Sequence, residues 1–169
     1  MSRWRPAPPK SSPYITQDGA KRLEGELKSL WERRGDVTKH LAAAAAEGDR
    51  SENAEYIYRK KELREIDRRI RYLQKRLPNL TVVATLPGNR DRVFFGAWVT
   101  LENDDGETFE YRIVGADEID PHMGWISVDS PMARAILKKE IDDPVQVSTP
   151  SGMAQYTIAE IRYQTLIPE

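Results

Sequence analysis

The stretch that decides the fold is Glu47-Gly48-Asp49-Arg50-Ser51-Glu52-Asn53-Ala54-Glu55-Tyr56, which lies between two long helical patterns. Gly48 is typical of the position just past the end of a helix. Because two long helices joined by a short turn must run antiparallel, the stretch predicts the tip of a helical hairpin. The tip also carries four carboxylates, on Glu47, Asp49, Glu52 and Glu55.

Apolar side chains recur every three or four residues on both sides of the tip, which is the spacing of a coiled-coil seam. The series before the tip is Ala20, Leu23, Leu27, Leu30, Arg34, Val37, Leu41 and Ala44, and the series after it is Tyr56, Arg59, Leu63, Ile66, Ile70, Leu73 and Leu77. Thr16 is the predicted N-cap of the first helix, and Pro78 ends the second. We therefore expect residues 14–80 to form an antiparallel coiled-coil hairpin with arms about 40 Å long.

The pattern changes from helical spacing to alternation after Pro78. Strands are predicted at 93–101, 108–114, 125–128, 145–148 and 156–161. Ser130 and Pro131 suit the N-cap and the first position of a short helix over 132–139. Residues 81–169 should thus form a mostly antiparallel sheet with one short helix, so the chain is α+β. Residues 1–13 contain four prolines and are predicted to be a disordered tail.

The composition excludes several kinds of site. No cysteine is present, which rules out disulfides and thiolate metal sites, and the two histidines, His40 and His122, lack ligand spacing. No apolar run approaches the roughly 18 residues of a membrane span, and the first residues lack the apolar region of a secretory signal. We expect a soluble cytoplasmic protein, without a membrane partner, that is monomeric when free.

Charge is divided unevenly along the chain. Residues 1–80 carry 19 Lys/Arg against 12 Asp/Glu, whereas residues 81–169 carry 7 against 15. Nine basic residues lie between 59 and 76 against three acidic ones, and the candidates for RNA binding are Arg59, Lys60, Lys61, Arg64, Arg68, Arg69 and Arg71. A charge run on a helix is usually a solvated face, but this surplus favours a phosphate track.

The acidic tip has two interpretations. Asp49 with Glu52 three residues later matches a capping box, and both carboxylates suit the positive end of a helix. Capping leaves the further charges of Glu47 and Glu55 unexplained. Carboxylates without histidine or cysteine select a hard cation, Mg²⁺ before Ca²⁺, and two of them complete a site rather than make one alone. An exposed tip also lacks the walls of a self-contained active site.

Residues Gly48-Asp49-Arg50-Ser51-Glu52-Asn53-Ala54-Glu55-Tyr56 resemble the signature of bacterial Gre transcript cleavage factors. Further segments at 64–73, 93–99, 102–106 and 129–135 resemble the GreB branch, and the resemblance covers about residues 14–163. It implies a hairpin that enters the secondary channel of RNA polymerase. It also implies an FKBP-like domain over residues 81–169 that docks at the rim of that channel.

The resemblance also implies roles for individual residues. Asp49 and Glu52 match the catalytic pair, which would hold one Mg²⁺ shared with the polymerase, none being tightly bound by the free protein. The basic helix would guide the nascent RNA 3′ end of a backtracked complex. Asp129, Ser130 and Pro131 match the loop used against the polymerase, although capping of the short helix explains them equally well. The protein would supply carboxylates in trans to the polymerase's own RNA cleavage and would be no enzyme by itself.

Other functions stay open at this point. A channel-occupying regulator, or an RNA-binding coiled-coil module without cleavage stimulation, would use the same basic helix. A structural adaptor would use that helix as a docking face and would leave the acidic tip unused.

Overall fold

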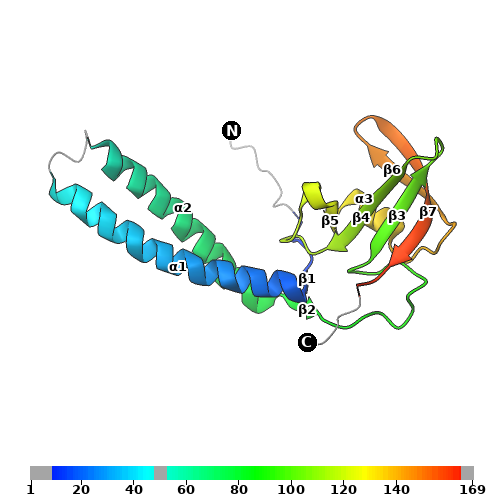
Figure 1. Cartoon of the computed structure of the whole chain (residues 1–169), viewed down its shortest axis with the longest axis horizontal. Coiled ribbons are helices and arrows are strands. Elements are labelled where there is room, and N and C mark those ends of the chain that lie inside the picture. Colours follow the sequence, from blue (N-terminus) through cyan, green and yellow to red (C-terminus); the bar gives the residue numbers. More distant parts are fainter. Residues whose placement is uncertain (1–8, 48–52, 165–169) are drawn as a thin grey trace, which may run out of the picture. The chain divides into compact units, whose positions relative to one another are not determined.

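The computed structural model describes residues 9–47 and 53–164, and its first half is a pair of long helices (Figure 1). Helix α1 spans Gln17–Ala46, helix α2 spans Ala54–Arg76, and a short 3₁₀ helix, η1, follows at Leu77–Asn79. At about 1.5 Å per residue, α1 is about 45 Å long. The prediction of a helical hairpin is confirmed. Within the described residues, neither helix is long and apolar enough to cross a membrane.

The hairpin seam is apolar at its centre and ionic at its edges. Val37, Ile66 and Ile70 are buried, and leucines at three neighbouring seam positions pack against them. Arg34, the polar position of the predicted seam, donates from Nε to Asp67 Oδ1 at 2.7 Å. The helices are therefore joined by a narrow apolar strip with charged pairs beside it.

The second half of the chain is built on a five-stranded sheet. Its strands are β3 (Trp98–Asn103), β4 (Thr108–Val114), β5 (Trp125–Ser127), β6 (Pro144–Thr149) and β7 (Gly152–Arg162). Their order is β5-β4-β3-β7-β6, and only the β4–β5 pair is parallel. Helix α3 (Pro131–Ile136) and a 3₁₀ turn, η2 (Pro121–Met123), complete this part. The predicted mostly antiparallel sheet with one short helix is confirmed.

The core of this sheet is formed by side chains that are almost completely buried. They are Val93, Ala97, Val99, Leu101, Ile113, Ala133, Ile136, Val145, Val147 and Ile158. Val99 and Leu101 alternate along β3 with more exposed neighbours, as expected for a strand with one buried face.

Two predicted boundaries in this half are wrong. The strand expected over 93–101 begins only at Trp98, because Gly96 has φ +86 and the Ala97 N–H closes a turn onto Phe94 O at 3.1 Å. Val93 and Ala97 are buried, so the apolar pattern marked core residues but not their backbone conformation. The helix expected to reach residue 139 ends at Ile136, and Lys138 adopts φ 67.

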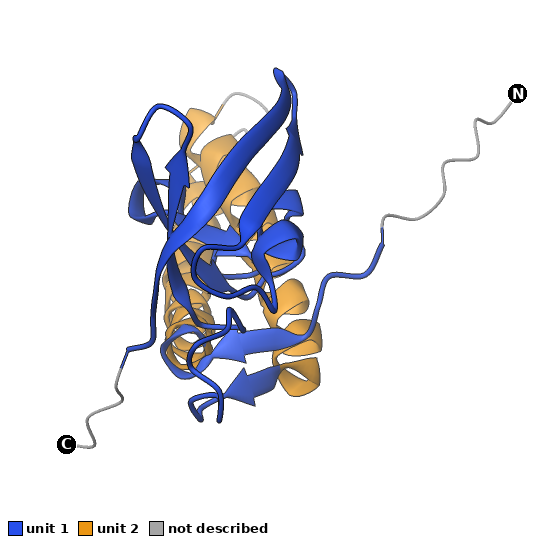
Figure 2. Cartoon of the chain, turned by 90° about the vertical axis from the view of Figure 1, so that its right-hand side faces the viewer, with its two compact units in different colours: residues 1–19, 81–169 blue, residues 20–80 orange. Residues whose placement is uncertain are grey.

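A short parallel pair of strands was not predicted. Strand β1 (Tyr14–Thr16) pairs with β2 (Thr81–Val83), in the register Tyr14 to Thr81. Residues 1–19 and 81–169 consequently form one compact unit and residues 20–80 the other (Figure 2). The division falls after Gly19 rather than before Tyr14, where the sequence analysis put it. The two are called the sheet unit and the hairpin unit below.

A buried carboxylate organises the start of the sheet unit. Glu118 is 2% exposed and accepts from the backbone N–H groups of Thr16, at 3.0 Å, and Gly115, at 2.8 Å. The Thr16 hydroxyl also donates to this carboxylate and accepts from Gly19 N–H at 3.0 Å. Thr16 is therefore the N-cap of α1, as predicted. A Cβ at Gly19 would overlap Glu118, so glycine is required there by close approach.

The last residues of the predicted tail have a fixed partner. Ser12 donates its N–H to Asp129 Oδ2 at 2.8 Å, and its hydroxyl donates to Asp129 Oδ1. The prediction of disorder therefore fails at Ser12, because two hydrogen bonds to one carboxylate hold it. Residues 1–8 lie outside the described part of the chain.

Candidate functional site

The two ends of the acidic tip are tied together by Asn53. Its Oδ1 accepts from Tyr56 N–H at 3.1 Å and caps α2, while its Nδ2 donates to Ala44 O in the last turn of α1 at 3.0 Å. One side chain thus satisfies an orphan donor of one helix and an orphan acceptor of the other. Asn53 was not predicted as a cap, because the spacing of Asp49 and Glu52 predicted a cap one turn earlier.

The proposed catalytic pair, Asp49 and Glu52, belongs to residues 48–52 and lies outside the described part of the chain. The capping-box interpretation of this pair is nevertheless wrong, because α2 begins at Ala54 with Asn53 as its cap. Among the described residues, no group of three or more His, Cys, Asp or Glu side chains is placed to hold a metal. The metal-ligand role of Asp49 and Glu52 therefore stays a prediction.

The predicted RNA-binding residues of α2 fall into two sets. Arg59 and Arg69 are half-buried in ion pairs of the hairpin: Arg59 Nη1 lies 3.1 Å from Glu62 Oε2, and Arg69 Nε lies 2.6 Å from Glu26 Oε1. Arg71 is exposed, and its Nε donates to Asp67 O at 3.3 Å. Of the predicted residues, Lys60, Lys61, Arg64 and Arg68 are exposed, and their side chains have no hydrogen bond or ion pair with any described residue. These four form the free cation set.

Glu62 is the centre of the ionic edge of the hairpin. It accepts hydrogen bonds from Arg33 on α1 and from Arg59 on α2. The hydrogen bond from Arg33 holds the pKa of Glu62 below its ordinary value and raises the pKa of Arg33. Two arginines are therefore committed to one carboxylate of the hairpin.

The predicted docking loop opens helix α3. Ser130 Oγ accepts from Ala133 N–H at 3.1 Å and is the N-cap, and Pro131 occupies the first helical position. The Asp129 N–H donates to Ser127 Oγ at 3.0 Å, and its carboxylate accepts from Ser12. The capping role of Ser130 is confirmed, and the docking role of the three residues stays a prediction.

Glu118 was not identified from the sequence. Nothing in a single sequence marks a buried carboxylate that accepts from a backbone N–H group 102 positions away, as Glu118 does from Thr16. Asn53, by contrast, is a residue type with high N-cap preference that directly precedes Ala54, and this signal was available.

The family models and the known relatives that this chain resembles indicate the same family. A model described as "Transcription elongation factor, N-terminal" matches residues 13–82, and one described as "Transcription elongation factor, GreA/GreB, C-term" matches residues 88–163. "Transcription elongation factor GreB" of Xanthomonas axonopodis pv. citri is 56% identical, over 98% of this chain and 100% of the relative. The protein of the same name from Pseudomonas aeruginosa is 56% identical, over 96% of this chain and 98% of its own length.

Among solved structures, GreA factor homolog 1 of Thermus thermophilus is 26% identical, covers 88% of this chain and 97% of its own, and has a TM-score of 0.41. The two family models lie on the hairpin and on the sheet, and the relatives span nearly the whole chain. The chain therefore belongs to the GreA/GreB family of transcription elongation factors.

Proposed function

We propose that this protein binds the secondary channel of bacterial RNA polymerase and stimulates cleavage of the 3′ end of backtracked nascent RNA. The observation that carries the proposal is the hairpin itself. Asn53 ties the last turn of α1, a helix about 45 Å long, to the start of α2, and Asp49 and Glu52 lie between these two helices in the sequence. The protein acts in trans, is no enzyme by itself, and works in the cytoplasm, where its partner is found.

The donor set of the tip fits Mg²⁺ and no softer metal. Asp49 and Glu52 offer carboxylate oxygens only, and Mg²⁺ is usually held by one or two carboxylates together with phosphates and waters. Mg²⁺ bound there supplies charge stabilisation at a phosphodiester and a more acidic bound water. Because two carboxylates are too few for a closed site, the remaining ligands come from the polymerase and the RNA, and the free protein binds the ion weakly.

The free cation set provides the RNA contact of the proposal. Lys60, Lys61, Arg64 and Arg68 are exposed on α2 and are not neutralised within the described hairpin. Phosphate contacts of this kind are independent of base sequence and weaken with salt. Arg59 and Arg69 contribute less, because releasing them would break ion pairs with Glu62 and Glu26.

The sheet unit supplies the polymerase contact. Asp129, Ser130 and Pro131 form a rigid corner, since Ser130 caps α3 and Pro131 fixes its first turn. We place the docking contact at this corner, with the free protein as a monomer that joins the polymerase one to one.

A purified backtracked transcription complex tests the proposal. Asp49→Ala and Glu52→Ala should each lower Mg²⁺-dependent RNA cleavage by about a hundredfold or more, in the range of lost transition-state charge stabilisation. Their ability to compete with wild-type protein for polymerase should stay unchanged. Glu65→Ala is the matched control, because it removes an exposed carboxylate of α2 outside the tip segment.

Three outcomes contradict the proposal. Cleavage at the wild-type rate by both tip variants would show that Asp49 and Glu52 have no catalytic role. Polymerase binding without any stimulated cleavage by the wild type would instead indicate a channel-occupying regulator. RNA cleavage without polymerase would show that the protein is an enzyme by itself.

A further inference from the structure

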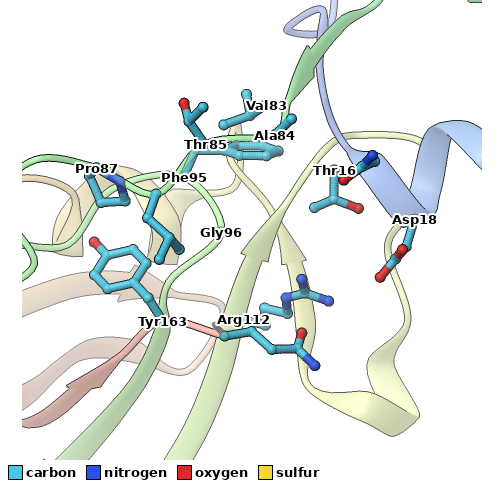
Figure 3. Close-up of a pocket in the computed structure, with 13 residues that line it drawn as sticks. Thr16, Asp18, Val83, Ala84, Thr85, Pro87, Phe95, Gly96, Arg112 and Tyr163 are labelled. Atoms are coloured by element: carbon cyan, nitrogen blue, oxygen red, sulfur yellow. The ribbon is translucent and has the colours of Figure 1, made fainter. Parts of the chain in front are cut away.

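A pocket of about 60 Å³ lies within the sheet unit, where Thr16 of β1 and Val83 of β2 approach Arg112 of β4 (Figure 3). It is lined by residues 16–18 at the start of α1, by residues 83–87 at and after the end of β2, by Arg112 of β4, and by residues 163 and 164 just after β7. A cavity needs about 10–15 Å³ of this kind of volume to hold one water molecule. The pocket can therefore hold a group the size of a few water molecules.

Arg112 lines this pocket and is 9% exposed. Its register neighbours on the two adjacent strands are Trp98 and Trp125. The guanidinium carbon lies 5.6 Å from the ring centroid of Trp98 and 5.0 Å from that of Trp125. The guanidinium therefore lies between two indole rings, one from each neighbouring strand, and its N–H groups are left for polar contacts.

The structure shows no acceptor for the guanidinium edge among the described residues, 9–47 and 53–164. Arg112 Nε is buried without a hydrogen-bond partner, and no described residue forms an ion pair with Arg112. Arginine carries five N–H donors and stays charged at any physiological pH. A buried charge of this kind is costly unless it is paired, and since no described residue pairs with it, the pocket is where a bound group could complete it.

We propose that this pocket is a binding site for a carboxylate, held by the edge of Arg112. A carboxylate is planar and accepts two parallel N–H bonds in the plane of a guanidinium. A phosphate is tetrahedral, so two of its oxygens would lie out of the guanidinium plane, where the neighbouring indole rings leave less room. The geometry thus selects a flat oxyanion. The side-chain amides of Gln17 and Gln164, which line the same pocket, supply further donors.

Asp18 sets the strength and the specificity of this site. It lines the pocket without forming an ion pair with Arg112, and its charge repels an entering anion. Residues 81–169 are also acidic overall, which suppresses non-specific anion binding. Binding is therefore weak and depends on the paired geometry at Arg112 rather than on a general positive field.

The two sources of a carboxylate are a free small acid and an acidic side chain of a larger molecule. Acetate and a capped aspartate, N-acetyl-aspartate N-methylamide, present the same group with and without a backbone. If both bind, the pocket accepts an acidic side chain; if only acetate binds, it is closed to anything longer. The site does not depend on the proposed function, because cleavage plays no part in the measurement.

The test is an NMR titration of the full chain at constant ionic strength. It follows the Arg112 Nε–H and the indole N–H signals of Trp98 and Trp125, which should shift saturably with acetate and not with chloride or phosphate. Arg112→Lys keeps the charge but loses the planar edge, and should weaken acetate binding by at least about tenfold. Asp18→Asn should strengthen it several-fold, and Arg134→Lys, at an exposed position outside the pocket, should leave it unchanged.

The wild-type titration decides the proposal even if Arg112→Lys fails to fold. No saturable shift with acetate would overturn it. Equal saturation by phosphate or chloride would overturn the selection of a flat oxyanion. Acetate binding that appears only in Asp18→Asn would show that Asp18 is the partner of Arg112 in solution, and would overturn the proposal as well.

Discussion

The interactions that stabilise the sheet unit internally differ from those that stabilise the hairpin unit. The sheet unit has a continuous core in which side chains such as Leu101, Ile113 and Ile158 are 0% exposed. The hairpin unit has a narrow seam around Val37, Ile66 and Ile70, with ion pairs along its edges. Two isolated helices offer each other only one face, so charges and caps carry a larger share of the hairpin's stability. The comparison indicates that the functional arm is the part more easily weakened.

The largest expected effect comes from the core of the sheet unit. Ile158→Ala should lower the free energy of unfolding by about 3 kcal/mol, because it removes fully buried methylenes and leaves a cavity. Urea denaturation followed by tryptophan fluorescence measures it, since Trp98 and Trp125 both lie in this unit. Met153→Ala on the same strand is the control; its side chain is 63% exposed and should matter little. If both substitutions lowered the free energy of unfolding equally, burial in this core would not be what stabilises the unit.

A smaller effect is expected at the end of the hairpin. Asn53→Ala removes the cap of α2 and should lower the stability of the helices by about 1 kcal/mol, the usual value of an N-cap. Asn53→Ser keeps an acceptor for Tyr56 N–H but loses the donor to Ala44 O. The stability of this variant should therefore lie between those of Asn53→Ala and the wild type. Circular dichroism at 222 nm during urea denaturation measures all three. A serine variant as weak as alanine would show that the bond to Ala44, and not the cap, matters.

The smallest effect is expected at the exposed ionic edge. Because the folded pKa of Glu62 lies below its unfolded value, the stabilisation by this carboxylate is present above the unfolded pKa and is lost as the pH falls through the folded pKa. Glu62→Gln should therefore melt slightly below wild type at neutral pH, and the difference should shrink in acid and at high salt. Glu65→Gln, an exposed carboxylate without an ion pair, should show no such dependence. A difference that grows as the pH falls would contradict the ion pair.

The regular elements were the part of the fold that the sequence predicted well. The seam positions from Ala20 to Leu73 predicted both helices, and Thr16, Ser130 and Pro131 marked helix starts that the structure confirms. These signals are local, since spacing and capping depend on residues a few positions apart. The β1–β2 pair was not predictable in this way, because two three-residue strands 65 positions apart carry no pattern of their own.

The candidate site, too, was predictable from the sequence only in part. The cations of α2 were evident as a surplus, but the sequence did not separate Arg59 and Arg69, which the hairpin pairs with Glu62 and Glu26, from the four exposed cations. For Arg69 that separation depends on α1 presenting Glu26, whereas Arg59 pairs with Glu62 three residues further along α2. The orphaned edge of Arg112 between two tryptophans is likewise visible only once β3, β4 and β5 lie side by side.

By itself, the sequence determined the helical hairpin, the mostly antiparallel sheet and the acidic tip between two helices, because these follow from periodicity, capping and local charge. Only the tertiary structure decided which charges are neutralised, which residue ties the two helices at the tip, and that residues 14–19 belong with the sheet. Each of these depends on contacts between residues distant in the chain, such as Thr16 with Glu118 and Asn53 with Ala44, which local pattern does not encode.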